Sequence, residues 1–321
     1  MRVNRGLVCE SKASQVSNTR RPSDGQFTIP KFLMSRAATE HVPEENGGGM
    51  LRLKLTIAYD GSGYAGWQVQ KTGTGVQEKV ELALAKLFPS RPRLHSSSRT
   101  DAGVHALGLV AHFDVPKGEM RMPVKKLVLA LNAWLPDDIR VLSAQLCRSN
   151  FHARFSATGK QYRYYIWNHP AMNPLLRHTA WHVPRALDVA AMRAGAKQFV
   201  GRHDFRALSS NPGYDRRSTV RCIRRCEVQK RGRLLTVIIE ADGFLYKMCR
   251  GIVGTLVQIG LGRFASSDMR RILAGRDRRL AGMTAPAHGL VLWRVTYPKS
   301  KNAVHSQGIA AIGDEDDAAI E

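Results

Sequence analysis

The stretch SSSRTDAGVHALGLVAHFDV, residues 96–115, carries the strongest signal in the sequence. It passes from a polar, turn-forming run directly into an apolar run typical of a strand. Asp101 is followed by Ala102 and Gly103, so a short carboxylate stands beside backbone of unusual conformational freedom, at the lip of a predicted sheet. That position suits a nucleophile or a base. The alternative is an Asx-turn, in which the carboxylate only accepts a hydrogen bond from its own backbone.

Apolar periods of two and of 3.6 residues alternate along the chain on either side of this stretch. Before residue 150 they follow the order strand, helix, strand, helix, and the order recurs loosely afterwards. We therefore predict an α+β protein with two similar halves, residues 50–150 and 151–298, around a shared cleft. The turn KRGR, residues 230–233, predicts an antiparallel hairpin. The predicted strands are Leu51 to Tyr59, Gly108 to Val115, Lys160 to Trp167, Arg221 to Gln229, Leu234 to Ala241 and Leu290 to Tyr297; the predicted helices are Val76 to Leu87, Pro123 to Leu135, Val189 to Val200, Tyr246 to Leu261 and Ser267 to Ala274.

Both ends of the chain lack this periodicity. Residues 1–49 mix small and polar residues and end in NGGG, so we predict a disordered leader. Met50 directly precedes the alternating run LRLKLTIAYDG, so the functional chain is expected to start there; the leader need not be native, and its removal should change activity little. Residues 299–321 end in GDEDDAAIE and are predicted to form a disordered acidic tail.

The charge of the chain indicates a polyanionic partner. The sequence holds 49 lysines and arginines against 26 acidic residues, a net charge of +23, and its isoelectric point is near 10.4. A field of this size attracts phosphate backbones, whereas the alternative is a basic surface that serves only solubility. Two basic runs, Arg202 to Arg225 and Arg270 to Arg279, are candidate RNA contacts or simply solvated faces.

Several other classes of protein are not expected. No run approaches the ~20 apolar residues of a membrane span, and no secretory signal is present at the N-terminus, so we expect a soluble cytoplasmic protein. The five cysteines are scattered and odd in number, as in a reducing compartment. Cys222 and Cys226 stand in a strand-like run without a second pair at zinc-ligand spacing, and His105, His112 and His152 also lack such spacing. We predict no metal site.

The segment RTDAGVH, residues 99–105, resembles the catalytic motif of the tRNA pseudouridine synthase A family without a gap. The resemblance extends over about residues 50–298. It implies the pseudouridine synthase fold, with a largely antiparallel mixed sheet and a central basic catalytic cleft. It also implies isomerisation of uridine to pseudouridine at positions 38 to 40 of the tRNA anticodon stem-loop, by a homodimer that needs no cofactor. The further matching segments, in order, are AYDGSGYAGWQVQ (58–70), GVQEKVELAL (75–84), NAWLPDDIRV (132–141), FHARFSATGKQYRYYIWN (151–168), GFLYKMCRGIVGTLVQIG (243–260) and TAPAHGLVL (284–292).

The resemblance also assigns roles to four residues. Asp101 corresponds to the essential catalytic carboxylate, and Arg250 to the arginine that pairs with it and favours its charged form. Tyr162 corresponds to the aromatic residue that lies against the target base, and Arg99 is expected to help hold the nucleotide after it leaves the stack. The alternatives are a strand tyrosine packed in the core for Tyr162 and a solvated helix charge for Arg250.

Two other functions remain open from the sequence. One is an RNA-binding or RNA-folding module without catalytic activity that keeps the scaffold and the basic surface. The joint presence of Asp101, Tyr162 and Arg250 argues against it, because binding a polyanion needs no carboxylate. The other is a synthase of the same fold directed at another RNA.

Overall fold

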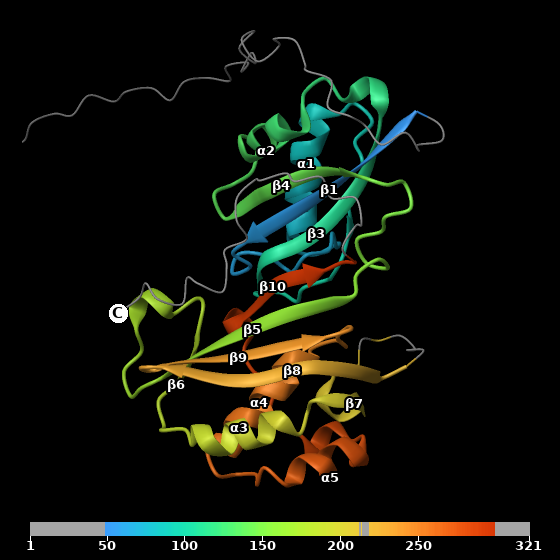
Figure 1. The fold of residues 1–321 in the computed structure, drawn as a ribbon. Coiled ribbons are helices and arrows are strands. Elements are labelled where there is room, and N and C mark those ends of the chain that lie inside the picture. The colour runs from blue at the N-terminus through green and yellow to red at the C-terminus, as the bar shows by residue number, and fades with distance from the viewer. Residues whose placement is uncertain (1–48, 212, 214–217, 299–321) are drawn as a thin grey trace, which may run out of the picture. The chain divides into compact units, whose positions relative to one another are not determined.

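The computed structural model describes residues 49–211, 213 and 218–298 (Figure 1). The predicted leader and acidic tail fall outside these residues, apart from Gly49. In the described part, helices and strands alternate in the order expected of an α+β protein. The elements are β1 (Met50–Tyr59), α1 (Val76–Leu87), β2 (His95–Ser96), β3 (His105–Pro116), α2 (Val124–Asn132), β4 (Ile139–Cys147), β5 (Gly159–Asn168), β6 (Trp181–Val183), α3 (Val189–Lys197), β7 (Gly201–Asp204), β8 (Val220–Arg231), β9 (Leu234–Ala241), α4 (Met248–Gly260), α5 (Asp268–Gly275) and β10 (Leu290–Thr296).

The described strands form one mixed, largely antiparallel sheet, with main order β4-β1-β3-β10-β5-β9-β8-β7. β2 pairs with β3, and β6 with β5, outside this path. The pairs β10–β3 and β5–β6 are parallel, and the other pairs are antiparallel. β10, the last strand in the sequence, lies between β3 and β5, so it joins strands from the two predicted halves. The α+β class and the sheet type are as predicted.

The hairpin of β8 and β9 confirms the turn prediction. The two strands are antiparallel, and Arg231 pairs with Leu234 across the turn. Gly232 has φ +55°, in the left-handed region that a tight two-residue turn requires and that glycine adopts without strain. A register shift between Ile223 and Arg225 interrupts the pairing further along β8.

The core follows from the two apolar periods. Every second residue of β1, from Leu51 to Tyr59, is buried, together with the apolar side of α1 that includes Val80 and Leu84. In Figure 1, α1 and α2 lie next to β1, β3 and β4, while α3, α4 and α5 lie next to β7, β8 and β9. One contiguous apolar cluster therefore runs under both groups of strands.

Helix α4 is the most deeply buried helix of the described part, because two of its glycines allow close backbone contact. A Cβ at Gly251 would collide with the carbonyl oxygen of Leu208, and a Cβ at Gly254 would collide with that of Met283. The segments around residues 208 and 283 can therefore pack directly on the helix backbone. This packing fixes the first turn of α4, in which Arg250 directly precedes Gly251.

Candidate active site

Asp101 lies in a tight turn directly before β3. Its carbonyl oxygen accepts a hydrogen bond from the Val104 N–H at 3.1 Å, and Gly103 has φ +76°, as the third residue of a type II turn requires. In an Asx-turn, the Asp101 carboxylate would accept the N–H of Gly103. That N–H instead donates to the carbonyl oxygen of Tyr64 at 3.3 Å. The Asx-turn alternative is therefore wrong, and the carboxylate is free to point elsewhere.

The loop after β1, residues 60–67, supports this turn from the side. Trp67 N–H donates to the carbonyl oxygen of Thr100 at 3.2 Å. A Cβ at Gly66 would lie 2.6 Å from the same carbonyl oxygen, and a Cβ at Gly61 would collide with the carbonyl oxygen of Val104. Glycine at both positions lets the two backbones touch, so the path of the chain on either side of Asp101 is fixed.

A buried hydroxyl pair holds the residue before Asp101. The Tyr59 and Thr100 hydroxyls lie 2.7 Å apart, and the two residues are only 5% and 8% exposed. Burial raises the pKa of Tyr59 well above its ordinary value, so the phenol stays protonated. Tyr59 comes from the end of β1, so the first strand of the sheet directly anchors the turn.

Arg250 brings the opposite charge to Asp101 from the other predicted half. Its Nη1 donates to Asp101 Oδ2 at 2.9 Å, and its Nε donates to the carbonyl oxygen of Ala285 at 2.7 Å. The side chains of Arg250 and Asp101 are 14% and 18% exposed, so the pair is largely shielded but not sealed. The alternative of a solvated helix charge is wrong for Arg250. The two residues lie 149 positions apart in the sequence, and the fold brings them together.

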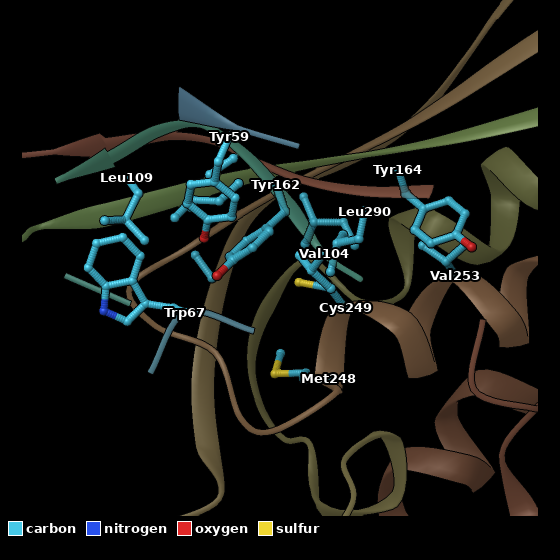
Figure 2. Close-up of a cluster of buried hydrophobic side chains, with 14 of the residues drawn as sticks. Tyr59, Trp67, Val104, Leu109, Tyr162, Tyr164, Met248, Cys249, Val253 and Leu290 are labelled. Carbon is cyan, nitrogen blue, oxygen red and sulfur yellow. The ribbon is translucent and has the colours of Figure 1, made fainter. Parts of the chain in front are cut away.

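Tyr162 packs beside this pair from β5. It is 7% exposed, and its ring meets Phe244 edge-on with 4.9 Å between centroids. Burial raises the pKa of Tyr162 well above its usual value, and the negative charge of Asp101 raises it further. Figure 2 shows Tyr162 between Tyr59 and the sulfur of Cys249. Tyr162 is thus part of the core, as the alternative held, and also a neighbour of the carboxylate.

Arg99 is exposed, two residues before Asp101 and on the same segment. Ala102, on the other side of Asp101, is exposed as well. The structure therefore brings Asp101, Tyr162 and Arg250 together and leaves Arg99 at the surface beside them.

Comparison with known proteins identifies the family of the chain. The family description that matches the chain is tRNA pseudouridine synthase, and the match covers residues 55–156 and 196–298. The chain belongs to the tRNA pseudouridine synthase A family. Three relatives with that name show the extent of the similarity. The one from Methylacidiphilum infernorum is 42% identical over 250 residues, which is 78% of this chain and 97% of the relative. The one from Exiguobacterium sibiricum is 43% identical over 256 residues, 79% and 100% of the two chains, and the one from Shouchella clausii is 46% identical over 250 residues, 77% and 94%.

The structure adds two residues to the site that sequence reasoning missed. Tyr59 and Thr100 fix the turn that carries Asp101, although neither was a candidate. Both stand inside segments that resemble the family, at the end of the first strand and directly before Asp101. The family resemblance therefore covered both residues, but only the fold shows that their hydroxyl groups are in contact.

The histidines considered above have structural partners. His105 is buried; its Nδ1 accepts the Gly61 N–H at 3.1 Å and lies 3.0 Å from the carboxylate of Asp60. His112 is buried, and its Nδ1 accepts the Ala153 N–H at 3.2 Å. Within residues 49–211, 213 and 218–298, no three His, Cys, Asp or Glu side chains are grouped so that they could hold a metal ion. No helix in these ranges has the length and apolar character needed to cross a membrane.

Both basic runs contain arginines with carboxylate partners, such as Arg225 with Glu227 at 2.8 Å in the first run. The run from 202 to 225 extends partly outside the described residues. In the run from 270 to 279, several arginines have carboxylate partners, which favours the solvated-face interpretation for them. These ion pairs are Arg271–Asp268 at 3.4 Å, Arg276–Asp204 at 3.1 Å and Arg279–Asp277 at 2.8 Å.

Proposed function

We propose that this chain is a tRNA pseudouridine synthase that converts uridines at positions 38 to 40 of the anticodon stem-loop, acting in the cytoplasm as a homodimer. The single observation that carries the proposal is the ion pair between Asp101 and Arg250, 2.9 Å long and partly open to solvent, in a chain of this family. A module that only binds RNA has no use for a largely shielded carboxylate that is paired with a dedicated arginine.

The reaction requires only what these residues supply. The bond between N1 of uracil and C1′ of ribose breaks, the base turns, and its C5 joins the same C1′. C5 then loses its proton and N1 gains one, so nothing is oxidised or reduced. An ionised carboxylate can act on the sugar or the ring as a nucleophile, or on the sugar as a base, and Arg250 places a positive charge against the carboxylate of Asp101.

The target nucleotide has to leave the base stack before Asp101 can reach its ribose. Flipping costs a few kcal/mol. Tyr162, whose ring lies beside the carboxylate, is proposed to hold the detached base, and burial keeps its phenol protonated. Arg99, exposed on the same segment, is proposed to occupy the vacated space or to hold the adjoining phosphate. An Arg99→Ala variant that kept both the rate and the tRNA affinity would remove this last role.

Carbodiimide-based mapping of pseudouridine tests the proposal in cells. RNA from cells with and without the protein is compared, and the expected result is loss of pseudouridine at positions 38 to 40 of several tRNAs. An unchanged tRNA map, or a loss confined to another RNA, would contradict it. Sedimentation of the purified protein at increasing concentration tests the homodimer.

A further inference from the structure

The loop that joins β4 to β5, residues 148–158, has an unusually well-anchored backbone. Arg52 of β1 donates from Nη1 to the carbonyl oxygens of Ser149 and Phe151, the latter at 2.8 Å. At the centre of the loop, the Ala153 carbonyl accepts the Tyr297 hydroxyl at 2.6 Å. The Ala153 N–H donates to buried His112, as described above. The loop is thus fixed from β1, from β3 and from the residue that follows β10.

Bonds within the loop complete its shape. His152 N–H donates to the Ser156 hydroxyl at 3.0 Å, and Ser156 N–H returns a bond to the His152 carbonyl at 2.9 Å. The His152 ring accepts the N–H of Arg154 at 3.1 Å through Nδ1. These contacts leave the loop little conformational freedom, so the direction of its outward side chains is set in advance.

This rigid loop displays an aromatic ring to solvent. Phe155 is 76% exposed; among the large apolar side chains in the described ranges, only Leu175 is more exposed. The guanidinium of Arg154 lies over the Phe155 ring, 5.6 Å from its centroid, and the His152 ring lies 4.3 Å away. Burying such a ring in the core would be favourable, so its display on a fixed loop points to a binding surface.

The loop leads into β5, and Lys160 near the start of that strand contacts the segment that precedes Asp101. Lys160 donates from Nζ to the carbonyl oxygen of Ser97 at 2.6 Å, and Ser97 precedes Asp101 by four residues, a span of at most about 14 Å. Lys160 and Tyr162 project from the same face of β5, because side chains two residues apart in a strand do so. Burial, together with the positive charges of Arg154 and Arg221, lowers the pKa of Lys160 to about 8. Arg154 is therefore close enough to Lys160 to affect the charge of that side chain.

We propose that Phe155 and Arg154 form a stacking platform for an unpaired base of the tRNA anticodon arm, other than the nucleotide that enters the Asp101 site. The proposal rests on the proposed function and names a second contact for the same substrate. A flat apolar ring beside cations matches a nucleotide, which presents a flat base beside an anionic phosphate. The net charge of +23 favours such an anionic partner.

The test compares variants of one exposed side chain. Phe155→Ala should weaken binding of an unmodified tRNA transcript by about five- to a hundredfold, the range that loss of one stacked base gives. Phe155→Tyr should restore it, because a phenol ring stacks as well. Leu175→Ala, which removes a side chain that is 88% exposed elsewhere on the surface, is the matched control and should leave affinity unchanged. All three variants should unfold at the wild-type temperature, because the substituted side chains make little core contact.

A fluorescent base analogue placed in turn at each unpaired position of the anticodon arm identifies the stacked base. At one position the wild type should quench the fluorescence and Phe155→Ala should not. If Phe155→Ala and Leu175→Ala bound tRNA with equal affinity, and quenching were unchanged at every position, the stacking platform would be overturned. The proposed function would still stand if the wild-type protein formed pseudouridine. Conversion of a dimer to a monomer by Phe155→Ala would also overturn the stacking platform, because the loop would then be a contact between copies.

Discussion

The hydroxyl pair of Tyr59 and Thr100 offers a quantitative test of how the catalytic turn is held. Both side chains are buried, at 5% and 8% exposure, and their oxygens are 2.7 Å apart. Tyr59→Phe removes one hydroxyl and leaves the other buried without a partner, which costs about 1–3 kcal/mol of unfolding free energy. Thr100→Val keeps the shape of the threonine side chain and should cost a similar amount, since it strands the tyrosine hydroxyl.

The double variant should cost clearly less than the sum of the single changes, because replacing both partners with apolar groups of the same shape leaves no buried hydroxyl unsatisfied. We expect a coupling free energy of about 1 kcal/mol or more, measured from urea unfolding of the wild type and the three variants. The single variants should also slow release of labelled hydrogen from C5 of uridine, because Thr100 adjoins Asp101. Additive unfolding free energies, together with wild-type rates in both single variants, would refute the anchoring role.

Three further predictions follow from the same structure. Arg250→Gln removes the cationic partner of Asp101 and should lower kcat/KM for tRNA by ~100-fold or more with little change in Kd; a rate near wild type would show that the ion pair is dispensable. Gly254→Ala places a methyl group against backbone and should lower the thermal unfolding temperature, whereas Gly118→Ala, which adds a methyl group in open space, should not; equal temperatures would contradict the close packing of α4. Burial and neighbouring cationic groups lower the pKa of His112 from 6.5 to about 4, so the unfolded chain takes up this proton first as the pH falls. The unfolding free energy should therefore decrease between about pH 6.5 and 4, and His112→Asn, which keeps an acceptor for the loop, should show a smaller decrease; parallel pH curves would contradict this.

The sequence predicted most of the fold because the apolar period is strong wherever an element has one buried face and one exposed face. The bounds of α1 and β9 match the predicted ranges, and the other predicted helices and strands are present with shifts of a few residues at their ends. β4 was missed because it is an edge strand whose buried residues are confined to Ile139 and Val141, so its alternation is weak. The short strands β2, β6 and β7 were missed because two to four residues are too few to show a period.

The candidate site was predictable to a different degree for each residue. The local sequence allowed two interpretations of Asp101, a catalytic carboxylate or an Asx-turn. Only the family resemblance favoured the catalytic carboxylate. Arg250, the partner of Asp101, is 149 residues away on a buried helix. The apolar pattern of that helix does not show which part of the core it packs against, so no local pattern could predict the ion pair. The Tyr59–Thr100 contact is equally invisible to local patterns, because it depends on where the end of β1 meets the turn before β3.

The most direct test of the account is a single-turnover measurement of pseudouridine formation by Asp101→Asn, with the Kd for tRNA measured on the same preparation. The substitution removes the negative charge and keeps the size of the side chain. The account predicts that product falls to background while Kd stays close to that of the wild type. Product formation at the wild-type rate would contradict the assignment of Asp101 as the catalytic carboxylate.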